Sequence, residues 1–201
     1  MLEGSLDGES MATQVLGKVN TRTRFLARQA RLLTRDSLRL LANSLVLCHL
    51  DYASVAWFSG LTGSTKKKLQ ISQNKLVRMV MGLGPRSHVG KRQFQELNWL
   101  PVESRVTQLR LNTVHNIQNH RAPNYLQNYF NTVRETHEHN TRSSIADLKP
   151  KNSPKSKMGR SSFAYSGAQE FNELPLPIKQ CVSLQPFRRN VRGWLMDRVE
   201  V

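Results

Sequence analysis

The chain has 201 residues and carries 30 Lys and Arg against 14 Asp and Glu, which gives a formal net charge of +16 at pH 7. This excess of positive charge favours a polyanionic partner, and only two cysteines exclude a disulfide framework and fit a reducing compartment. The longest apolar stretch, residues 38–58, contains polar residues that exclude a membrane span, and the acidic opening MLEGSLDGES excludes a secretory signal.

The first third of the chain predicts three amphipathic helices. The first spans residues 12–33, where Val15, Val19, Leu26, Ala30 and Leu33 fall on one face. The second spans residues 37–58, begins at a cap supplied by Thr34 or Asp36, and is apolar on nearly every side after Leu45. We therefore expect it at the centre of a bundle.

The third helix starts at Thr62, Ser64 or Thr65 and ends near Met81, where glycines and Pro85 stop it. Its apolar face combines Leu69, Leu76, Val77 and Val80. Three helices joined by short loops predict an antiparallel three-helix bundle, and therefore an all-α fold class.

The remainder of the chain predicts shorter helices and no strand. Helices are expected over residues 91–97, over 101–119 and around 122–126; the inward positions of the longer one are Val102, Val106, Leu109, Val114 and Ile117. Residues 131–160 have few apolar side chains and many lysines, which indicates an exposed basic linker. Two final helices are expected over residues 163–171 and 184–199. The organisation is then a stub (1–11), a bundle (12–84), additional helices (85–130), a linker (131–160) and a helical tail (161–201).

Basic residues recur at helical spacing opposite the apolar faces. The first helix carries a stripe of Arg24, Arg28, Arg31 and Arg35, and the third carries a patch of Lys66, Lys67, Lys68, Lys75 and Arg78. Between residues 10 and 90 only Asp36 and Asp51 are negative, so few ion pairs can neutralise these cations. The pattern favours contact with phosphates over a merely solvated helix face, which is the alternative reading.

No catalytic or metal-binding constellation is apparent. The five aspartates (Asp7, Asp36, Asp51, Asp147 and Asp197) are scattered, and none forms the adjacent pair that a two-metal polymerase site needs. Neighbouring Cys48, His49 and Asp51 point in different directions on a helix, so we interpret Cys48 as core filler and the other two as structural polar contacts. The sequence predicts no zinc site, because Cys181 stands alone and His137 and His139 fall in the linker. Trp57, Trp99 and Trp194 are interpreted as core anchors. No cofactor is expected.

Several segments, in this order, resemble the C-terminal region of reverse transcriptases from LINE-type non-LTR retrotransposons of the jockey and CR1-like groups. The segments are LGKVNTRTRFLARQARLLT (16–34), LANSLVLCHLDYASVAW (41–57), LQISQNKLVRMVMGL (69–83), FQELNWLPVESRV (94–106), APNYL (122–126), TRSS (141–144) and GAQEFNELPLPIKQ (167–180), which leads into LQPFRRNVRGWL (184–195). One departure is Phe171-Asn172-Glu173 before Leu174-Pro175, where the family usually has Trp-Asn. The replacement keeps an aromatic ring.

The resemblance implies that residues 12–84 are a helical thumb and that the rest is a post-thumb region, both following a palm that this chain does not include. It implies a fragment of an RNA-directed DNA polymerase that grips the backbone of RNA, an RNA–DNA hybrid or a DNA duplex without catalysis of its own. Its partners would be that nucleic acid and the missing palm and fingers, with no membrane. The location would be the nucleus, or otherwise the cytoplasm. Two alternatives stay open: a decayed transposon remnant without autonomous function, and a truncated form of an active reverse transcriptase.

Overall fold

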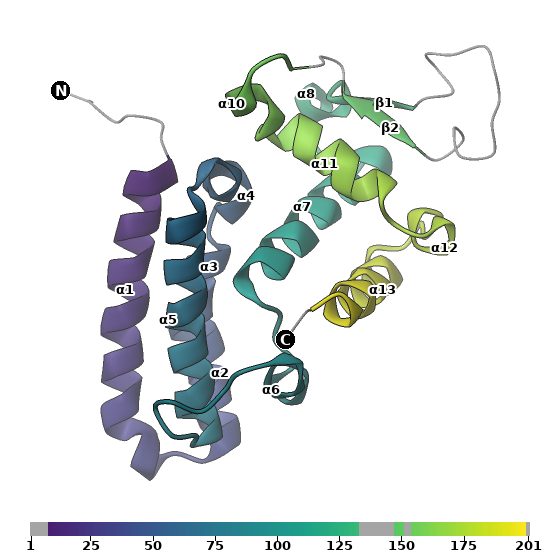
Figure 1. Cartoon of the computed structure of the whole chain (residues 1–201). Coiled ribbons are helices and arrows are strands. Elements are labelled where there is room, and N and C mark those ends of the chain that lie inside the picture. Colours follow the sequence, from purple (N-terminus) through teal and green to yellow (C-terminus); the bar gives the residue numbers. More distant parts are fainter. Residues whose placement is uncertain (1–7, 133–146, 151–153, 200–201) are drawn as a thin grey trace. The chain divides into compact units, whose positions relative to one another are not determined.

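The computed structural model describes residues 8–132, 147–150 and 154–199, and these form a predominantly helical protein (Figure 1). The predicted all-α class is confirmed; the strands described are a single short antiparallel pair. The chain divides into two compact units. The first comprises residues 1–106 and 196–201, and the second comprises residues 107–195. The expected boundary between the bundle and the additional helices, after residue 84, falls inside the first unit, which continues to Val106 and takes in residues 196–201.

The first unit is built on three helical rods that pack side by side (Figure 1). The first rod is α1 (Gly8–Gln29), extended by a 3-10 turn, η1 (Ala30–Leu32). The second contains α2 (Arg35–Ala42), a π-helical segment η2 (Asn43–Leu47), α3 (Cys48–Asp51), α4 (Ser54–Trp57) and a 3-10 turn η3 (Phe58–Gly60). The third is α5 (Gly63–Met81), and α6 (Lys91–Leu97) follows it.

Local sequence signals set the ends of these rods where they were expected. The Thr34 hydroxyl accepts the Ser37 amide at the start of α2, and the Thr62 hydroxyl caps α5 in the same way. Gly82 ends α5 in the left-handed region at φ 65°, where a residue with a Cβ would be strained. Short connections then make the second rod antiparallel to α1 and α5, which run parallel to each other.

The prediction of one continuous helix over residues 37–58 is wrong. The π-helical segment interrupts the regular turns, and the helix ends at Asp51 because Ala53 adopts a left-handed conformation at φ 48°. Two side chains hold this break: Ser54 Oγ donates to the Asp51 carbonyl at 3.1 Å, and Trp57 Nε1 donates to the Tyr52 carbonyl at 3.0 Å. These contacts take up the carbonyls that a continuing helix would have used.

The second rod is also not the centre of the bundle. Leu40 and Tyr52 are 67% and 69% exposed, and Cys48, predicted as core filler, is exposed too. The rod most deeply buried is α5, whose predicted apolar face is confirmed at Leu69, Leu76, Val77 and Val80. Because α5 packs against α1, α2 and α6, it also buries the polar residues Thr65, Ser72 and Gln73 beside its apolar face.

The second unit centres on the C-terminal part of α7 (Val102–Gln118), which begins in the first unit and continues here. It further contains α8 (Asn124–Gln127), α10 (Lys157–Arg160), α11 (Phe163–Asn172), α12 (Leu176–Lys179) and α13 (Leu184–Asp197), whose last two residues belong to the first unit. Its apolar core includes Leu111, Ala168, Phe171, Phe187 and Val191. A Cβ on Gly167 would lie 3.0 Å from Val114 Cγ2, so the glycine permits close packing of α11 against α7.

Part of the segment predicted as a linker is ordered. Strand β1 (Phe130–Thr132) pairs antiparallel with β2 (Leu148–Pro150), with Asn131 opposite Lys149. Leu148 is buried, and the Asn172 side chain binds both its amide (2.8 Å) and its carbonyl (2.9 Å). The linker assignment therefore does not hold for residues 147–150. Residues 1–7 of the predicted stub and 133–146 and 151–153 of the predicted linker lie outside the described residues.

Candidate nucleic-acid interface

Arg24 and Arg28 of α1, with Arg31 of the 3-10 turn η1, line the edge of the first rod that borders α5. Asn20 Oδ1 accepts a hydrogen bond from Ser72 Oγ of α5 at 3.0 Å, which marks this edge. Arg24 follows Asn20 by one turn, and Arg28 and Arg31 continue the row at helical spacing. All three arginines are exposed. They have no hydrogen-bond or ion-pair partner within the described part of the chain.

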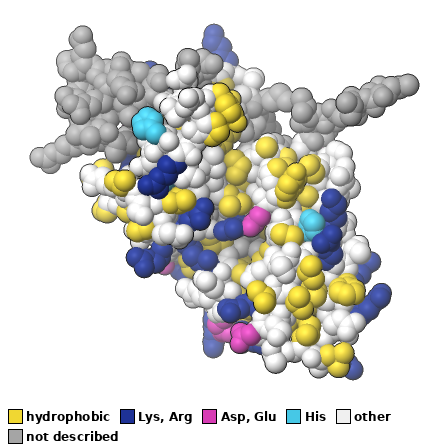
Figure 2. All heavy atoms as spheres, turned by 180° about the vertical axis from the view of Figure 1, so that it is seen from behind, with side chains coloured by type: hydrophobic (Ala, Val, Ile, Leu, Met, Phe, Trp, Pro, Cys, Tyr) yellow, Lys and Arg dark blue, Asp and Glu magenta, His cyan; other side chains and the backbone are white. Residues whose placement is uncertain are grey.

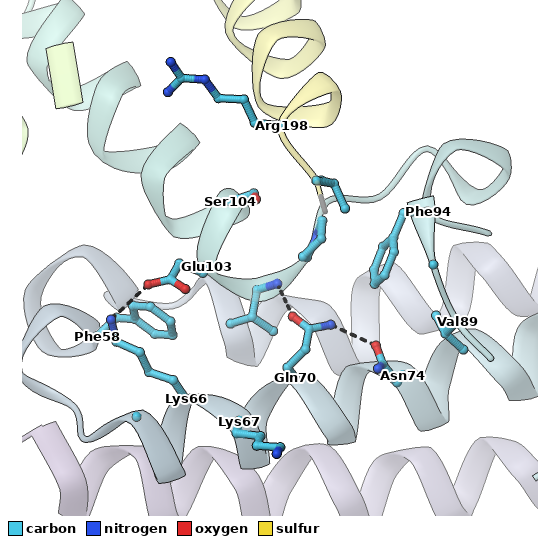
Figure 3. Close-up of a pocket in the computed structure, with 15 residues that line it drawn as sticks. Phe58, Lys66, Lys67, Gln70, Asn74, Val89, Phe94, Glu103, Ser104 and Arg198 are labelled. Carbon is cyan, nitrogen blue, oxygen red and sulfur yellow. Dashed lines mark hydrogen bonds and ion pairs between the residues drawn. The ribbon is translucent and has the colours of Figure 1, made fainter. Parts of the chain in front are cut away.

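Lysines occupy the facing edge of α5. Lys68 and Lys75 lie one turn before and one turn after Ser72, so they stand on the side of α5 that borders α1. Lys67 is not on this edge: it is one of the residues that line a pocket on another side of α5 (Figure 3). All three lysines are exposed. We call this surface the α1–α5 seam, and its seam cations are Arg24, Arg28, Arg31, Lys68 and Lys75.

The carboxylates of the first unit are engaged elsewhere. Glu9, the acid closest to the seam, accepts the Thr62 amide and the Thr65 hydroxyl, both at 2.7 Å. These bonds, together with the charge of Lys68, lower the pKa of Glu9. The other described acids of the unit form ion pairs, namely Asp36 with Arg39, Asp51 with Arg105, Glu96 with Arg35 and Arg92, Glu103 with Lys66, and Asp197 with Lys91. No described carboxylate therefore lies within ion-pair distance of a seam cation.

Three of the predicted site residues have structural contacts instead. Arg35 is not on the first helix but begins α2, and its Nη2 lies 3.0 Å from Glu96 Oε2 of α6. Lys66 Nζ lies 3.0 Å from Glu103 Oε1 and 5.0 Å from the centre of the Phe58 ring. Arg78 Nε donates to the Ser87 carbonyl at 2.7 Å and so fixes the loop after α5. The predicted stripe is shorter than expected because α1 gives way to a 3-10 turn and a new helix.

The opposite edge of α1 carries a cationic and aromatic row that the sequence analysis did not single out. Lys18, Arg22 and Phe25 are spaced at helical intervals and are all exposed. Arg22 Nη1 donates to the Leu45 carbonyl of the π-helical segment at 3.4 Å. Burial, and then the charges of Arg22 and Lys18, lower the pKa of His49. The sequence signal that could have identified this row is its spacing, four residues from Lys18 to Arg22 and three residues from Arg22 to Phe25.

The groups considered for catalysis or metal binding do not converge. Asp51 binds Arg105 at 2.8 Å and makes no hydrogen bond to His49, whereas the second described histidine with a shifted pKa, His115, lies in the other unit. The described aspartates all form ion pairs, and Asp7 lies outside the described residues. Within the described residues no group of three His, Cys, Asp or Glu side chains could hold a metal ion. His137 and His139 lie outside them.

The expectation that the tryptophans anchor the core holds for two of the three. Trp57 and Trp99 are buried, at 8% and 6% exposure. Trp194 is half-buried on α13 in the second unit. The two buried tryptophans of the first unit therefore offer no open stacking surface beside the seam.

A pocket of about 540 Å³ lies in the first unit between α5, α6 and the start of α7 (Figure 3). Several of its polar side chains are engaged with neighbouring residues. Gln70 accepts the Val102 amide at 2.9 Å and donates to Asn74 at 2.8 Å, and Lys66 is paired with Glu103 across the opening (Figure 3). This arrangement holds the start of α7 against α5.

Positively charged side chains outnumber negatively charged ones on the protein surface. Figure 2 shows one face of the protein, where Lys and Arg side chains are spread widely and Asp and Glu are sparse. No helix in the described part is long and apolar enough to cross a membrane.

The comparisons with known proteins give no match. No protein-family model matches the chain, and no curated protein and no solved structure matches it at a significant level.

Proposed function

We propose that this chain binds the sugar–phosphate backbone of a nucleic acid through the α1–α5 seam. The main observation behind the proposal is how the described carboxylates of the first unit are paired. They form ion pairs or cap α5, and the exposed seam cations are left without a described carboxylate partner. Arginine suits such a role because its planar guanidinium can donate two hydrogen bonds to one phosphate.

The seam fits contact with a backbone better than it fits reading of bases. Its cations are long, exposed side chains on α1 with its 3-10 turn η1 and on α5, and these two rods pack side by side. Phosphate contacts position a protein on nucleic acid without sequence information, and they need only exposed positive charge. The grip of a polymerase on a template–primer duplex is a function of this kind.

The sequence resemblance makes the proposal more specific. The chain is then the thumb and post-thumb part of a LINE-type non-LTR retrotransposon reverse transcriptase, with no polymerase carboxylates of its own. It would work beside the palm and fingers of the parent polyprotein, in the nucleus, on RNA, an RNA–DNA hybrid or a DNA duplex. The alternative of a decayed remnant predicts that the isolated chain unfolds without a cooperative transition, which a thermal scan of the same protein distinguishes.

The salt dependence of binding tests the proposal. We expect the full chain to bind a fluorescent RNA–DNA duplex, with an affinity that falls steeply as salt rises, because each phosphate contact releases counterions. Replacing Arg24, Arg28 and Arg31 together with glutamine should reduce the slope of log affinity against log salt by about 0.9 for each phosphate that an arginine no longer neutralises. Fluorescence anisotropy over a salt series measures this slope.

A charge-matched variant controls for the loss of net charge. Arg35, Arg39 and Arg92 also belong to the first unit, but each forms an ion pair with a carboxylate. Their joint replacement by glutamine removes the same charge and should leave the slope nearly unchanged. An equal change in both variants would contradict a specific role for the seam, and a slope near zero in the unmodified chain would contradict nucleic-acid binding altogether.

A further inference from the structure

Phe25 is an exposed aromatic ring on α1, a helix that buries Val15, Val19 and Leu26. It is 56% exposed, whereas Val19 and Leu26 of the same helix are each 1% exposed. The residues one turn away on either side are Arg22 and Arg28, so cations rather than apolar side chains flank the ring. An exposed ring of this size between two arginines has no role in the core of the first unit.

The cations beside Phe25 form a concentrated positive site. Arg22 Nη1 donates a hydrogen bond to the Leu45 carbonyl of the π-helical segment at 3.4 Å. Lys18 lies one turn before Arg22, about 6 Å along the helix axis. Both charges act on His49 of α3, whose Nε2 is buried without a hydrogen-bond partner among the described residues. No described carboxylate pairs with Lys18 or Arg22.

The combination of an open ring and neighbouring cations matches one kind of ligand. Base–aromatic stacking beside a basic surface is the usual way in which proteins hold single-stranded nucleic acid, and every base presents a face that can stack. A duplex offers no such face along its length, because its bases already stack on one another. The row formed by Lys18, Arg22 and Phe25 therefore differs in its ligand from the seam, which contacts backbone alone.

We propose that Phe25 stacks on an unpaired base of a single-stranded nucleic-acid segment whose phosphates contact Arg22 and Lys18. The inference rests on the proposed function, since it assigns a second ligand form to the same helix. The seam holds a duplex backbone on one edge of α1, and this row holds an unpaired stretch of nucleic acid on the other edge. The arginine between them, Arg28, belongs to the seam and flanks the ring.

The test compares oligonucleotides with and without bases. The probes are a fluorescent 15-nucleotide thymidine oligomer and an abasic oligomer of the same length and charge, each titrated with the full chain. Phe25→Ala should weaken binding of the thymidine oligomer by about tenfold. It should leave binding of the abasic oligomer unchanged. Phe25→Trp should retain or strengthen the thymidine complex, and Phe25→Leu should behave like Phe25→Ala because leucine is apolar but offers no ring.

Matched variants separate the possible failures. Tyr125→Ala removes an aromatic side chain that is 73% exposed in the second unit and should change neither affinity. If Phe25→Ala weakens both oligomers equally, or if Phe25→Leu binds as well as the unmodified chain, the stacking role is wrong while salt-dependent duplex binding stands. If the chain binds no oligonucleotide or duplex at low salt, both the stacking site and the proposed function are overturned. A thermal scan of each variant shows that the chain is folded.

Discussion

The seam cations of the first unit and two buried cations of the second unit lie in opposite surroundings. In the first unit the seam cations face solvent, and the described carboxylates pair with other residues. In the second unit Arg110 and Lys179 are nearly buried, with side chains 5% and 8% exposed, and each is paired with a carboxylate, Glu170 and Asp147 respectively. A count of positive charge treats these residues alike. Their partners show which cations stabilise the fold and which are left for a ligand.

This difference matters because burial changes what a charge contributes. A buried cation without its partner destabilises the folded protein strongly, since the charge cannot be solvated. An exposed cation that is removed costs almost nothing in stability but can weaken the binding of a ligand. Replacing the buried cations of the second unit should therefore lower stability. Replacing the seam cations of the first unit should weaken ligand binding and leave stability nearly unchanged.

The largest expected effect is on the buried pair in the second unit. Arg110 Nη1 contacts Glu170 Oε1, and Thr107 Oγ1 donates to the same oxygen at 3.3 Å. Burial raises the pKa of Glu170 even though the charge of Arg110 opposes the shift. Glu170→Ala should lower the free energy of unfolding by about 3 kcal/mol, because Arg110 stays buried without its carboxylate. Urea denaturation followed by circular dichroism measures the loss.

A double variant shows whether the loss comes from the stranded charge. Arg110→Leu together with Glu170→Leu removes both charges and keeps apolar volume, so it should recover most of the stability. If Glu170→Ala costs less than about 0.5 kcal/mol, the second unit does not depend on its buried ion pair and the contrast between the units fails.

A second effect concerns pH, through His115 of the second unit. Its Nε2 donates to the Cys181 carbonyl at 2.6 Å, and its ring stacks on Phe187 with 4.2 Å between the ring centres. Burial lowers the pKa of His115 below its ordinary value of 6.5. Below that value the unfolded chain binds more protons than the folded chain, so the free energy of unfolding should fall as pH falls.

The expected slope is at most about 1.4 kcal/mol per pH unit below about pH 6.5. The raised pKa of Glu170 acts in the opposite sense above 4.5, so the informative quantity is the difference between two proteins. His115→Gln should be flatter than the unmodified chain between about pH 7 and 5.5 when urea midpoints are compared. Parallel curves would show that His115 does not titrate with unfolding.

A smaller effect is expected where the first unit uses a cation structurally. Arg105 donates to both carboxylate oxygens of Asp51, at 3.0 Å from Nε to Oδ1 and 2.8 Å from Nη2 to Oδ2. Both side chains are about one-third exposed. Asp51→Ala should therefore cost about 1 kcal/mol, less than the buried pair, because water partly solvates the arginine that remains. A loss as large as that of Glu170→Ala would contradict this grading by burial.

The smallest effect on stability is expected at the seam itself. Replacing Arg24, Arg28 and Arg31 with glutamine should change the free energy of unfolding by less than about 0.5 kcal/mol, because exposed residues without partners contribute little. The same urea titration measures it. A larger loss would mean that these arginines support the fold and are not held ready for a ligand.

Local signals predicted much of this fold. The caps at Thr34 and Thr62, the stop at Gly82 and the bounds of α6 follow from residues adjacent to each helix end. The break after Asp51 could not be predicted, because it depends on the bond from Trp57 to the Tyr52 carbonyl and on Arg105, which lies 54 residues away from Asp51.

In the candidate site, too, the features set by nearby residues could be predicted and those set by distant residues could not. Helical spacing located Arg24, Arg28 and Arg31 correctly on an exposed face. Helical spacing could not show that Arg35 does not belong to the predicted stripe. The carboxylate that pairs with Arg35 is Glu96, which lies 61 residues later in the chain. The spacing of Lys18, Arg22 and Phe25 could be recognised in the sequence. Whether the Phe25 ring is exposed could not, because that depends on how the second rod packs against α1.

Chemical footprinting of lysines tests the location of the nucleic-acid contact most directly. The full chain is acetylated with and without a saturating RNA–DNA duplex, and mass spectrometry measures the modification of each lysine. Lys68 and Lys75 should become protected, while Lys91 of the first unit and Lys179 of the second, which pair with Asp197 and Asp147, should not change. Uniform protection, or protection only outside the α1–α5 seam, would contradict its assignment as the backbone-binding surface.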